Sequence, residues 1–173
     1  MNDLKQLDDK LRALREDFDR SFAVATTETG AEQLDFLRIR IAGDPYALRF
    51  SEVASLHADR RLVLAPSPLP ELCGIAGFRG VLTPVYDLAA VLGYRGVATK
   101  RWLVVAQWPS AIAFAFEAFE MHLRVPVDQI SQASDDANGA VHSGGRAVPL
   151  LHLPSLVEGI ARRIKAPGPT HER

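Results

Sequence analysis

The spacing of apolar residues changes near residue 34. Before it, in residues 1–24, apolar side chains recur at intervals of three and four among charged residues: Leu4, Leu7, Leu11, Leu14 and Phe18. This spacing predicts an amphipathic helix with a narrow apolar seam. The seam could dock on the body of the same chain, or it could pair with another chain. Residues 25–33, which lack such a pattern, are expected to form a linker.

From residue 34 the pattern is typical of β-strands. FLRIRI (36–41) alternates apolar and basic residues, and after the turn signal Gly43-Asp44-Pro45 a second strand is expected from YALRF (46–50), continued by Val53 and Leu56. Further strands are predicted at 102–108, 111–119, 121–130, around Val141, and at 147–153. The helical spacing of Leu156, Val157, Ile160 and Ile164 predicts a C-terminal helix, and residues 166–173 are expected to form a loose tail.

An internal repeat relates the two parts of this β region. With a shift of 66 residues, Phe36 aligns with Trp102, Leu37 with Leu103, Ile39 with Val105 and Ala47 with Ala113. With a shift of 65, Gly80 aligns with Gly145, Pro84 with Pro149 and Leu88 with Leu153. The repeat predicts a mainly β fold of two small, intertwined barrel subdomains, approximately 34–100 and 101–165, related by a pseudo-dyad. The groove between two such barrels could accept a peptide or a helix.

Composition and charge argue against several classes of protein. The formal net charge of −1 leaves no basic excess for a nucleic-acid partner. No apolar run approaches the roughly 18 residues of a membrane span, and the charged N-terminus has no signal-peptide core, so we expect a cytoplasmic protein. The single cysteine, Cys73, excludes an internal disulfide, and the five histidines show no metal-binding spacing. No cofactor is therefore expected.

The segment from Pro70 to Gly93, PELCGIAGFRGVLTPVYDLAAVLG, has the most distinctive motif. A small-residue run leads to an arginine at an expected sharp turn, then to an apolar pair, a proline and an acidic residue before a short amphipathic piece. The motif positions are Gly74, Arg79, Gly80, Pro84, Asp87 and Gly93. In this order the residues resemble the signature of the CheW-like domain, and the resemblance extends over roughly 35–165, across both halves.

The resemblance implies two five-stranded SH3-like barrels and a protein that works by binding alone. CheW-like adaptors join the cytoplasmic tips of chemoreceptors to a CheA-type histidine kinase, at its regulatory domain, and contact other CheW-like proteins. Receptor contact is implied for Arg79, with Gly80 and Gly74 beside it. Kinase contact is implied for a face of the first subdomain that includes Phe50, Val53 and Ser55, while Pro84, Asp87 and Gly93 belong to the structural signature. Recruitment to receptor arrays at the membrane would follow, without insertion into it.

Two positions depart from the family pattern. Gly77 stands where the family usually has an asparagine, two residues before the arginine, and Ser55 stands where an acidic residue is common. These departures leave open an accessory protein that binds the receptor but not the kinase.

Readings outside adaptor function also remain at this point. Arg79 could simply hold the turn by bonding carbonyl groups. Asp87 and His152 fall at nearly equivalent positions of the repeat, so a small hydrolase that uses both is conceivable, although no nucleophile is placed beside them. An RNA-binding small barrel is disfavoured because the chain lacks a basic aromatic face.

Overall fold

The computed structural model describes residues 32–96, 99–107, 110–131 and 139–165. The predicted N-terminal helix (1–24), most of the expected linker and the tail (166–173) lie outside these ranges. Gln33, assigned to the linker from sequence, already belongs to the first strand, where it pairs with Pro126.

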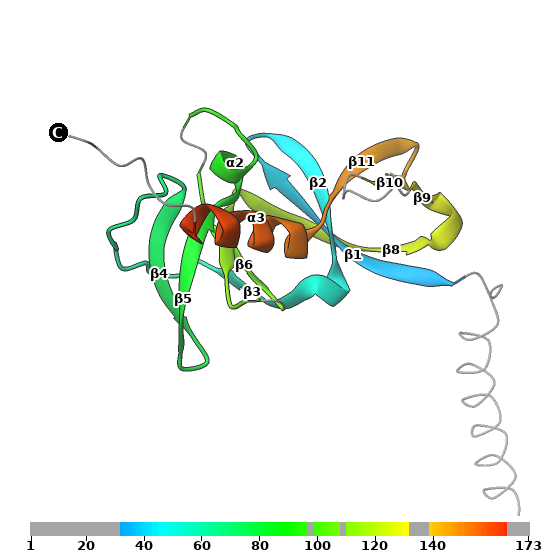
Figure 1. Ribbon diagram of the computed structural model, residues 1–173. Helices are drawn as coiled ribbons and strands as arrows, with labels where there is room; N and C mark the ends of the chain where they lie inside the picture. Colours follow the sequence, from blue (N-terminus) through cyan, green and yellow to red (C-terminus); the bar gives the residue numbers. More distant parts are fainter. Residues whose placement is uncertain (1–31, 97–98, 108–109, 132–138, 166–173) are drawn as a thin grey trace, which may run out of the picture. The chain divides into compact units, whose positions relative to one another are not determined.

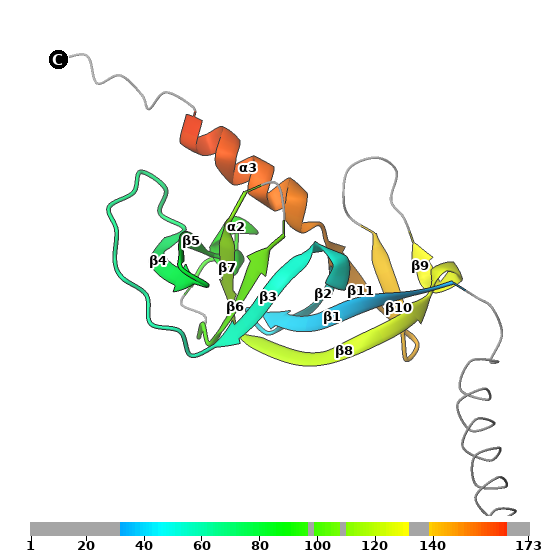
Figure 2. The same ribbon diagram turned by 90° about the horizontal axis from the view of Figure 1, so that it is seen from below.

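The described residues fold mainly as β-strands in two sheets (Figures 1 and 2). The five-stranded sheet has the order β3-β6-β7-β5-β4, with β3 Val53–Ala58, β4 Leu72–Phe78, β5 Val81–Asp87, β6 Trp102–Ala106 and β7 Ala113–Phe116. The six-stranded sheet has the order β8-β1-β2-β11-β10-β9, with β1 Gln33–Ile41, β2 Asp44–Arg49, β8 Ala118–Pro126, β9 Ile130–Ser131, β10 Ala140–Ser143 and β11 Arg146–Leu151. The expectation of five strands in each subdomain therefore fails for the second sheet, because the short β9 adds a sixth.

Short helical elements connect the sheets and cover them. A 3-10 turn, Phe50–Glu52, carries the chain from β2 in one sheet to β3 in the other, so the strand expected to continue from YALRF through Val53 is interrupted. A second 3-10 turn, Val127–Gln129, joins β8 to β9. Helix α2 (Leu88–Val91) follows β5, and α3 (Leu153–Lys165) follows β11, in agreement with the predicted C-terminal helix. None of the helices in the described ranges is long and apolar enough to cross a membrane.

Three hydrophobic clusters make up the core. One is enclosed by the five-stranded sheet and includes Phe78 and Leu103, and another is enclosed by the six-stranded sheet and includes Phe36 and Val148. The largest, the central cluster, combines side chains from both sheets with the buried face of α3: Leu37, Leu48, Val104, Phe114, Leu153, Val157 and Ile160 are among them. The two sheets thus share one apolar core, in which Phe114 and Phe116 are 0% and 2% exposed.

The internal repeat is visible in strand register. Leu37 pairs with Leu48 in the β1–β2 hairpin, and Val104 pairs with Phe114 at the same place in the β6–β7 hairpin. The structural shift between β1 and β6 is therefore 67 residues, not the 66 inferred from sequence. A slip of one residue turns a strand over, and the burial pattern shows it: Leu37 lies in the central cluster with Val104, whereas Leu103 lies inside the five-stranded sheet.

Each sheet takes strands from both halves of the sequence. In the five-stranded sheet, β5 runs parallel to β7, with Val85 beside Ala113. In the six-stranded sheet, β11 runs parallel to β2, with Leu150 beside Ala47. A shift of 65 residues maps Val85 onto Leu150, and a shift of 66 maps Ala47 onto Ala113. Each repeat therefore contributes its first hairpin, β1–β2 or β6–β7, to the sheet that holds the remaining strands of the other repeat.

Candidate protein-interaction site on the five-stranded sheet

Arg79 lies in the tight turn that joins β4 to β5. Phe78 and Val81 are the last cross-strand pair, so only Arg79 and Gly80 form the connection. Both residues have positive φ, 48° at Arg79 and 82° at Gly80, as a two-residue turn that matches strand twist requires. Glycine adopts this conformation without strain, whereas arginine does so at a cost of about 1 kcal/mol or more. The predicted sharp turn is therefore present, with a strained, charged residue at its tip.

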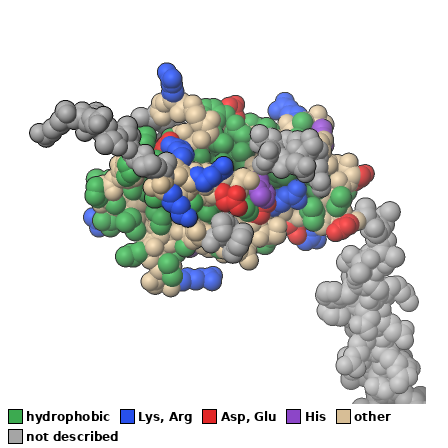
Figure 3. Space-filling view, viewed as in Figure 1, with side chains coloured by type: hydrophobic (Ala, Val, Ile, Leu, Met, Phe, Trp, Pro, Cys, Tyr) green, Lys and Arg blue, Asp and Glu red, His purple; other side chains and the backbone are tan. Residues whose placement is uncertain are grey.

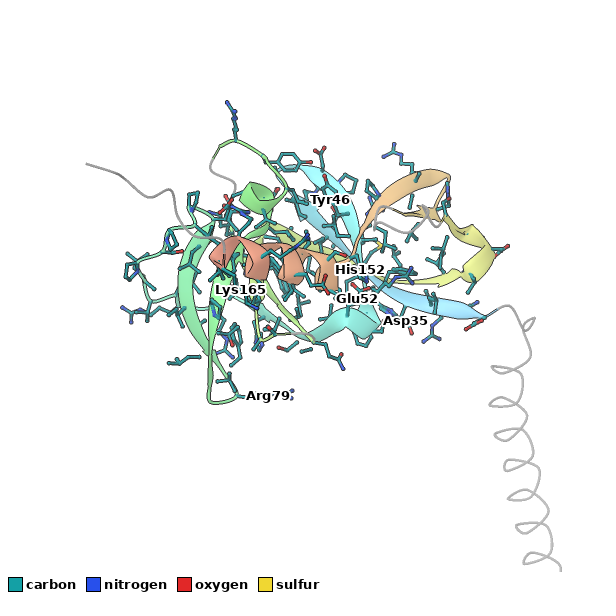
Figure 4. The ribbon with its side chains drawn as sticks, in the orientation of Figure 1. Asp35, Tyr46, Glu52, Arg79, His152 and Lys165 are labelled. Carbon is teal, nitrogen blue, oxygen red and sulfur yellow. The ribbon has the colours of Figure 1, made fainter. Side chains whose placement is uncertain are left out.

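The Arg79 side chain points away from the body of the protein (Figure 4). Within the described residues, no hydrogen bond or ion pair engages its guanidinium group. The reading in which Arg79 holds the turn by bonding carbonyl groups thus has no contact to support it.

A hollow of about 290 Å³ opens beside the turn. Its walls come from β3, from the β4–β5 hairpin and from the connection after β6, and they include Ser55, Phe78, Arg79, Thr83 and Gln107. The structure therefore brings together Ser55 and Arg79, which the resemblance assigned to different partners. Because its lining mixes apolar groups with a few polar ones under a cationic rim, the hollow can accept an apolar side chain of a partner protein.

His57 supports the wall of this site. Its Nε2 atom lies 2.9 Å from Ser55 Oγ, and its ring packs on Phe78 with the centroids 4.8 Å apart. Burial lowers the pKa of His57 from its usual 6.5, and the charges of Arg60 and Arg79 lower it further. The ring is therefore largely neutral near pH 7, and the positive charge at this end of the sheet belongs to the arginines.

Phe50 and Val53 occupy different surroundings from Ser55. Phe50 is 52% exposed in the 3-10 turn, and its ring stands edge-on to His122 of β8 at a centroid distance of 6.0 Å. Val53 is partly buried against the central cluster. Of the three residues expected to contact the kinase, only Ser55 lines the hollow with Arg79.

Gly74 contributes through packing. Its φ is 145°, and a Cβ atom built there would lie 2.5 Å from the carbonyl oxygen of Val63. That close approach exists because Val63, in the segment before β4, exchanges two backbone hydrogen bonds with Ile75, of 2.9 and 2.8 Å. Gly74 therefore lets this segment lie against the sheet. Pro84 is partly buried within β5, and Gly93, with φ of 87°, ends the turn after α2.

Asp87 and His152 each begin a helix. Asp87 Oδ1 accepts hydrogen bonds from the backbone N–H groups of Ala89 and Ala90, and Oδ2 lies 2.7 Å from Lys100 Nζ. His152 Nδ1 accepts from the backbone N–H of Ser155 at 3.3 Å. The two residues thus cap α2 and α3 at equivalent positions. These capping contacts give no support to the hydrolase that would use Asp87 and His152 together. Among the described residues, no cluster of three potential metal ligands occurs.

Glu52 has a structural role that no sequence pattern indicated. Its Oε2 accepts a hydrogen bond of 2.8 Å from the backbone N–H of Leu153, and its Oε1 lies 3.5 Å from His152 Nε2 and 3.7 Å from Arg49 Nε (Figure 4). Burial raises the Glu52 pKa, although the hydrogen bond from Leu153 opposes the shift. Glu52 therefore fastens the start of α3 to the turn between the sheets, across 101 positions of sequence.

Comparison with known proteins gives a consistent family assignment. The pattern of the CheW-like domain family matches residues 35–161. Among solved structures, the chain is similar to the scaffolding protein TtCheW from Thermoanaerobacter tengcongensis, with a TM-score of 0.65, 18% sequence identity, and coverage of 73% of this chain and 94% of that one. At this identity the likeness shows a shared fold. The comparison with curated proteins gives no match.

Proposed function

Because the chain belongs to the CheW-like domain family, we propose that it is a signalling adaptor, not an enzyme, and that it joins chemoreceptor cytoplasmic tips to a CheA-type histidine kinase. The observation that carries the proposal is the position of Arg79, exposed in a strained turn beside a hollow that Ser55 also lines. Strained backbone persists where the surrounding structure holds it, and it is concentrated at functional sites. A role in binding explains why an arginine stands at a position whose backbone conformation favours glycine.

Arg79 would act at the edge of the receptor contact. Its guanidinium group has five donors and is free among the described residues to meet a partner's carboxylates or carbonyl groups. Gly80 completes the turn, and Gly74 supports the hairpin by letting the segment before β4 pack closely. Burial of apolar surface should supply most of the affinity, with the arginine fixing the register of the partner.

Ser55, which lines the hollow, and Phe50, which is exposed in the 3-10 turn beside β8, would both serve the kinase contact. The regulatory domain of a CheA-type kinase would dock against this end of the five-stranded sheet, barrel against barrel, with Val53 supporting the surface from beneath. We further propose that each sheet forms an SH3-like barrel and that residues 34–165 make up a single CheW-like domain. The protein would then work in the cytoplasm at membrane-associated receptor arrays, where other CheW-like proteins are further partners.

A second candidate is an accessory adaptor that binds the receptor and not the kinase. Ser55 supplies a hydroxyl where the family pattern has an acidic residue, and Gly77 supplies no side chain at all. Glu52, the nearest acidic residue before β3, is turned toward α3. A kinase surface that needs a carboxylate at this place would therefore find none.

The experiment that tests the proposal is a binding titration of the full chain with two purified fragments. One fragment is a chemoreceptor cytoplasmic tip and the other is a CheA-type regulatory domain. An adaptor binds both, and Arg79→Ala weakens receptor binding at least tenfold. Binding to the receptor alone identifies the accessory form, and binding to neither contradicts the proposal.

A further inference from the structure

The hollow beside Arg79 has positive charge near it and no carboxylate to balance that charge. No aspartate or glutamate lines it. Among the described residues, neither Arg79 nor Arg60, which contacts His57 in the wall of the site, has an ion-pair partner. Both charges act on His57 and lower its pKa. Figure 3 shows basic and hydrophobic side chains, and no acidic ones, at the tip of the β4–β5 hairpin. An unbalanced positive rim of this kind attracts an anion.

Two other hollows in the described part of the chain provide a comparison. One, near the β1–β2 turn, is lined by Arg95 and also by Glu117. The other, at the start of β1, is lined by Arg49 and also by Asp35. Each of these hollows contains an arginine together with a carboxylate. In the hollow beside Arg79, the negative charge has to come from a partner.

His57 determines what the Ser55 hydroxyl can offer to a ligand. Arg60 Nη2 lies 3.5 Å from His57 Nδ1, and because a guanidinium group can only donate, Nδ1 acts as the acceptor. The proton of the neutral ring is then on Nε2, which donates to Ser55 Oγ at 2.9 Å. This is the one side-chain hydrogen bond of Ser55 among the described residues. Its own hydroxyl hydrogen therefore remains available in the hollow.

The hollow thus combines hydrogen-bond donors with an apolar lining. The donors are the Ser55 hydroxyl and the Arg79 guanidinium group, and the apolar lining includes Phe78 and Val105, which are 6% and 7% exposed. A carboxylate on a short hydrocarbon stem is complementary to both parts, since charge-assisted bonds hold its oxygens and its methylene groups meet apolar atoms. Inorganic phosphate, which is polar on every side, would leave the apolar lining unused.

We propose that this hollow binds the acidic side chain, glutamate or aspartate, of a partner protein, and that His57 positions the Ser55 hydroxyl as a donor to the carboxylate. The inference rests on the proposed role of the hollow in partner binding. It narrows that role, because Arg79 alone could equally meet a carbonyl group. His57 acts through Ser55 and is a positioning residue.

The probe is a capped tripeptide, acetyl-Ala-Glu-Ala-amide, titrated into the full-length chain and followed by NMR. It should shift the amide resonances of Ser55, Phe78 and Arg79. It should also raise the pKa of His57, because the added negative charge offsets the two arginines. The neutral counterpart with glutamine in place of glutamate, and inorganic phosphate, should each bind about tenfold more weakly.

Substitutions separate the charge of the hollow from charge elsewhere. Ser55→Ala and Arg79→Gln should each weaken binding of the glutamate peptide about tenfold. The matched control is Arg95→Gln, which removes the same charge from a hollow that has its own carboxylate, and it should leave binding unchanged. His57→Ala should weaken binding, whereas His57→Gln, which keeps a donor for Ser55 Oγ, should restore part of it.

Four results would overturn the proposal. They are the absence of shifts at Ser55 and Arg79, equal binding of the glutamine peptide or of phosphate, equal loss in Arg95→Gln, and unchanged binding in His57→Ala. Receptor and kinase fragments are titrated separately. Fragment binding without binding of the glutamate peptide would contradict this inference alone, and peptide binding without fragment binding would contradict the proposed function alone.

Discussion

Arg79 and Gly144 occupy the same position in two equivalent hairpin turns, with φ of 48° and 59°. Each is followed by a glycine of positive φ, Gly80 at 82° and Gly145 at 76°. The six-stranded sheet thus uses two glycines where the five-stranded sheet uses an arginine and a glycine. The fold itself therefore accepts glycine at this place, and the arginine needs a different explanation.

Replacement of Arg79 should separate stability from binding. Arg79→Gly relieves the left-handed strain, which offsets the greater flexibility of glycine in the unfolded chain, so the free energy of unfolding should stay equal or rise by up to about 1 kcal/mol. Receptor binding should fall at least tenfold. Urea unfolding and a binding titration measure the two effects. A variant that loses more than about 1 kcal/mol of stability would show that Arg79 holds the turn.

Two glycines of β4 should respond differently to alanine. Gly74→Ala places a Cβ against the Val63 carbonyl oxygen at φ of 145°, so it should cost about 2 kcal/mol or more. Gly77→Ala meets open space and should change stability by less than about 0.5 kcal/mol. Denaturant unfolding of both variants measures this difference. Equal costs would contradict the close packing of Val63 on the sheet.

Glu52 should make stability depend on pH. Its folded-state pKa is raised above 4.5 by burial, so its contribution is fully present below the unfolded pKa and is lost as pH rises through the folded value. Glu52→Gln keeps an oxygen acceptor for the Leu153 N–H but does not ionise. Relative to wild type, this variant should therefore gain stability between pH 4 and pH 7.

Thermal unfolding of wild type, Glu52→Gln and Glu52→Ala over that pH range provides the measurement for Glu52. Glu52→Ala removes the acceptor and should be the least stable of the three, by about 1 to 3 kcal/mol relative to wild type. A difference between Glu52→Gln and wild type that does not change with pH would rule out the buried carboxyl as the cause.

The pKa of His57 should depend on the charges of the two arginines near it, Arg60 and Arg79. Burial and the charges of Arg60 and Arg79 lower its pKa, so the stability it contributes is present above pH 6.5 and is lost as pH falls toward the folded-state value. NMR titration should place the pKa below 6.5 in the wild type and nearer to 6.5 in Arg60→Ala and Arg79→Ala. No change in either variant would place the two charges away from the ring.

Sequence patterns predicted several strands and the C-terminal helix, because the spacing of apolar residues within a short segment is enough to indicate these elements. Alternation in 36–41 predicted β1, and the spacing of Val157 and Ile160 predicted α3. The error of one residue in aligning β1 with β6 has a physical cause. Leu37 and its partner Leu48 lie eleven positions apart, whereas Val104 and its partner Phe114 lie ten apart, so a single shift cannot fit both strands of the hairpin.

The contacts that make up the candidate site are distant in sequence. Arg79 and Ser55 meet because β3 and the β4–β5 hairpin frame the same hollow, and spacing along the chain contains no such information. Glu52 finds its partner Leu153 across the whole domain. Leu82 and Pro84 belong to the apolar pair and the proline of the sequence motif, and only the strand register shows that their side chains face away from those of Thr83 and Val85.

The most direct test of the adaptor account is assembly of a three-part complex. A receptor cytoplasmic tip and a CheA-type regulatory domain are mixed with and without the full-length chain and analysed by size-exclusion chromatography with light scattering. We predict that the two fragments co-elute only when the chain is present, and that Arg79→Gly abolishes this co-elution while remaining folded. Separate elution of the receptor and kinase fragments in the presence of the wild-type chain would contradict the account.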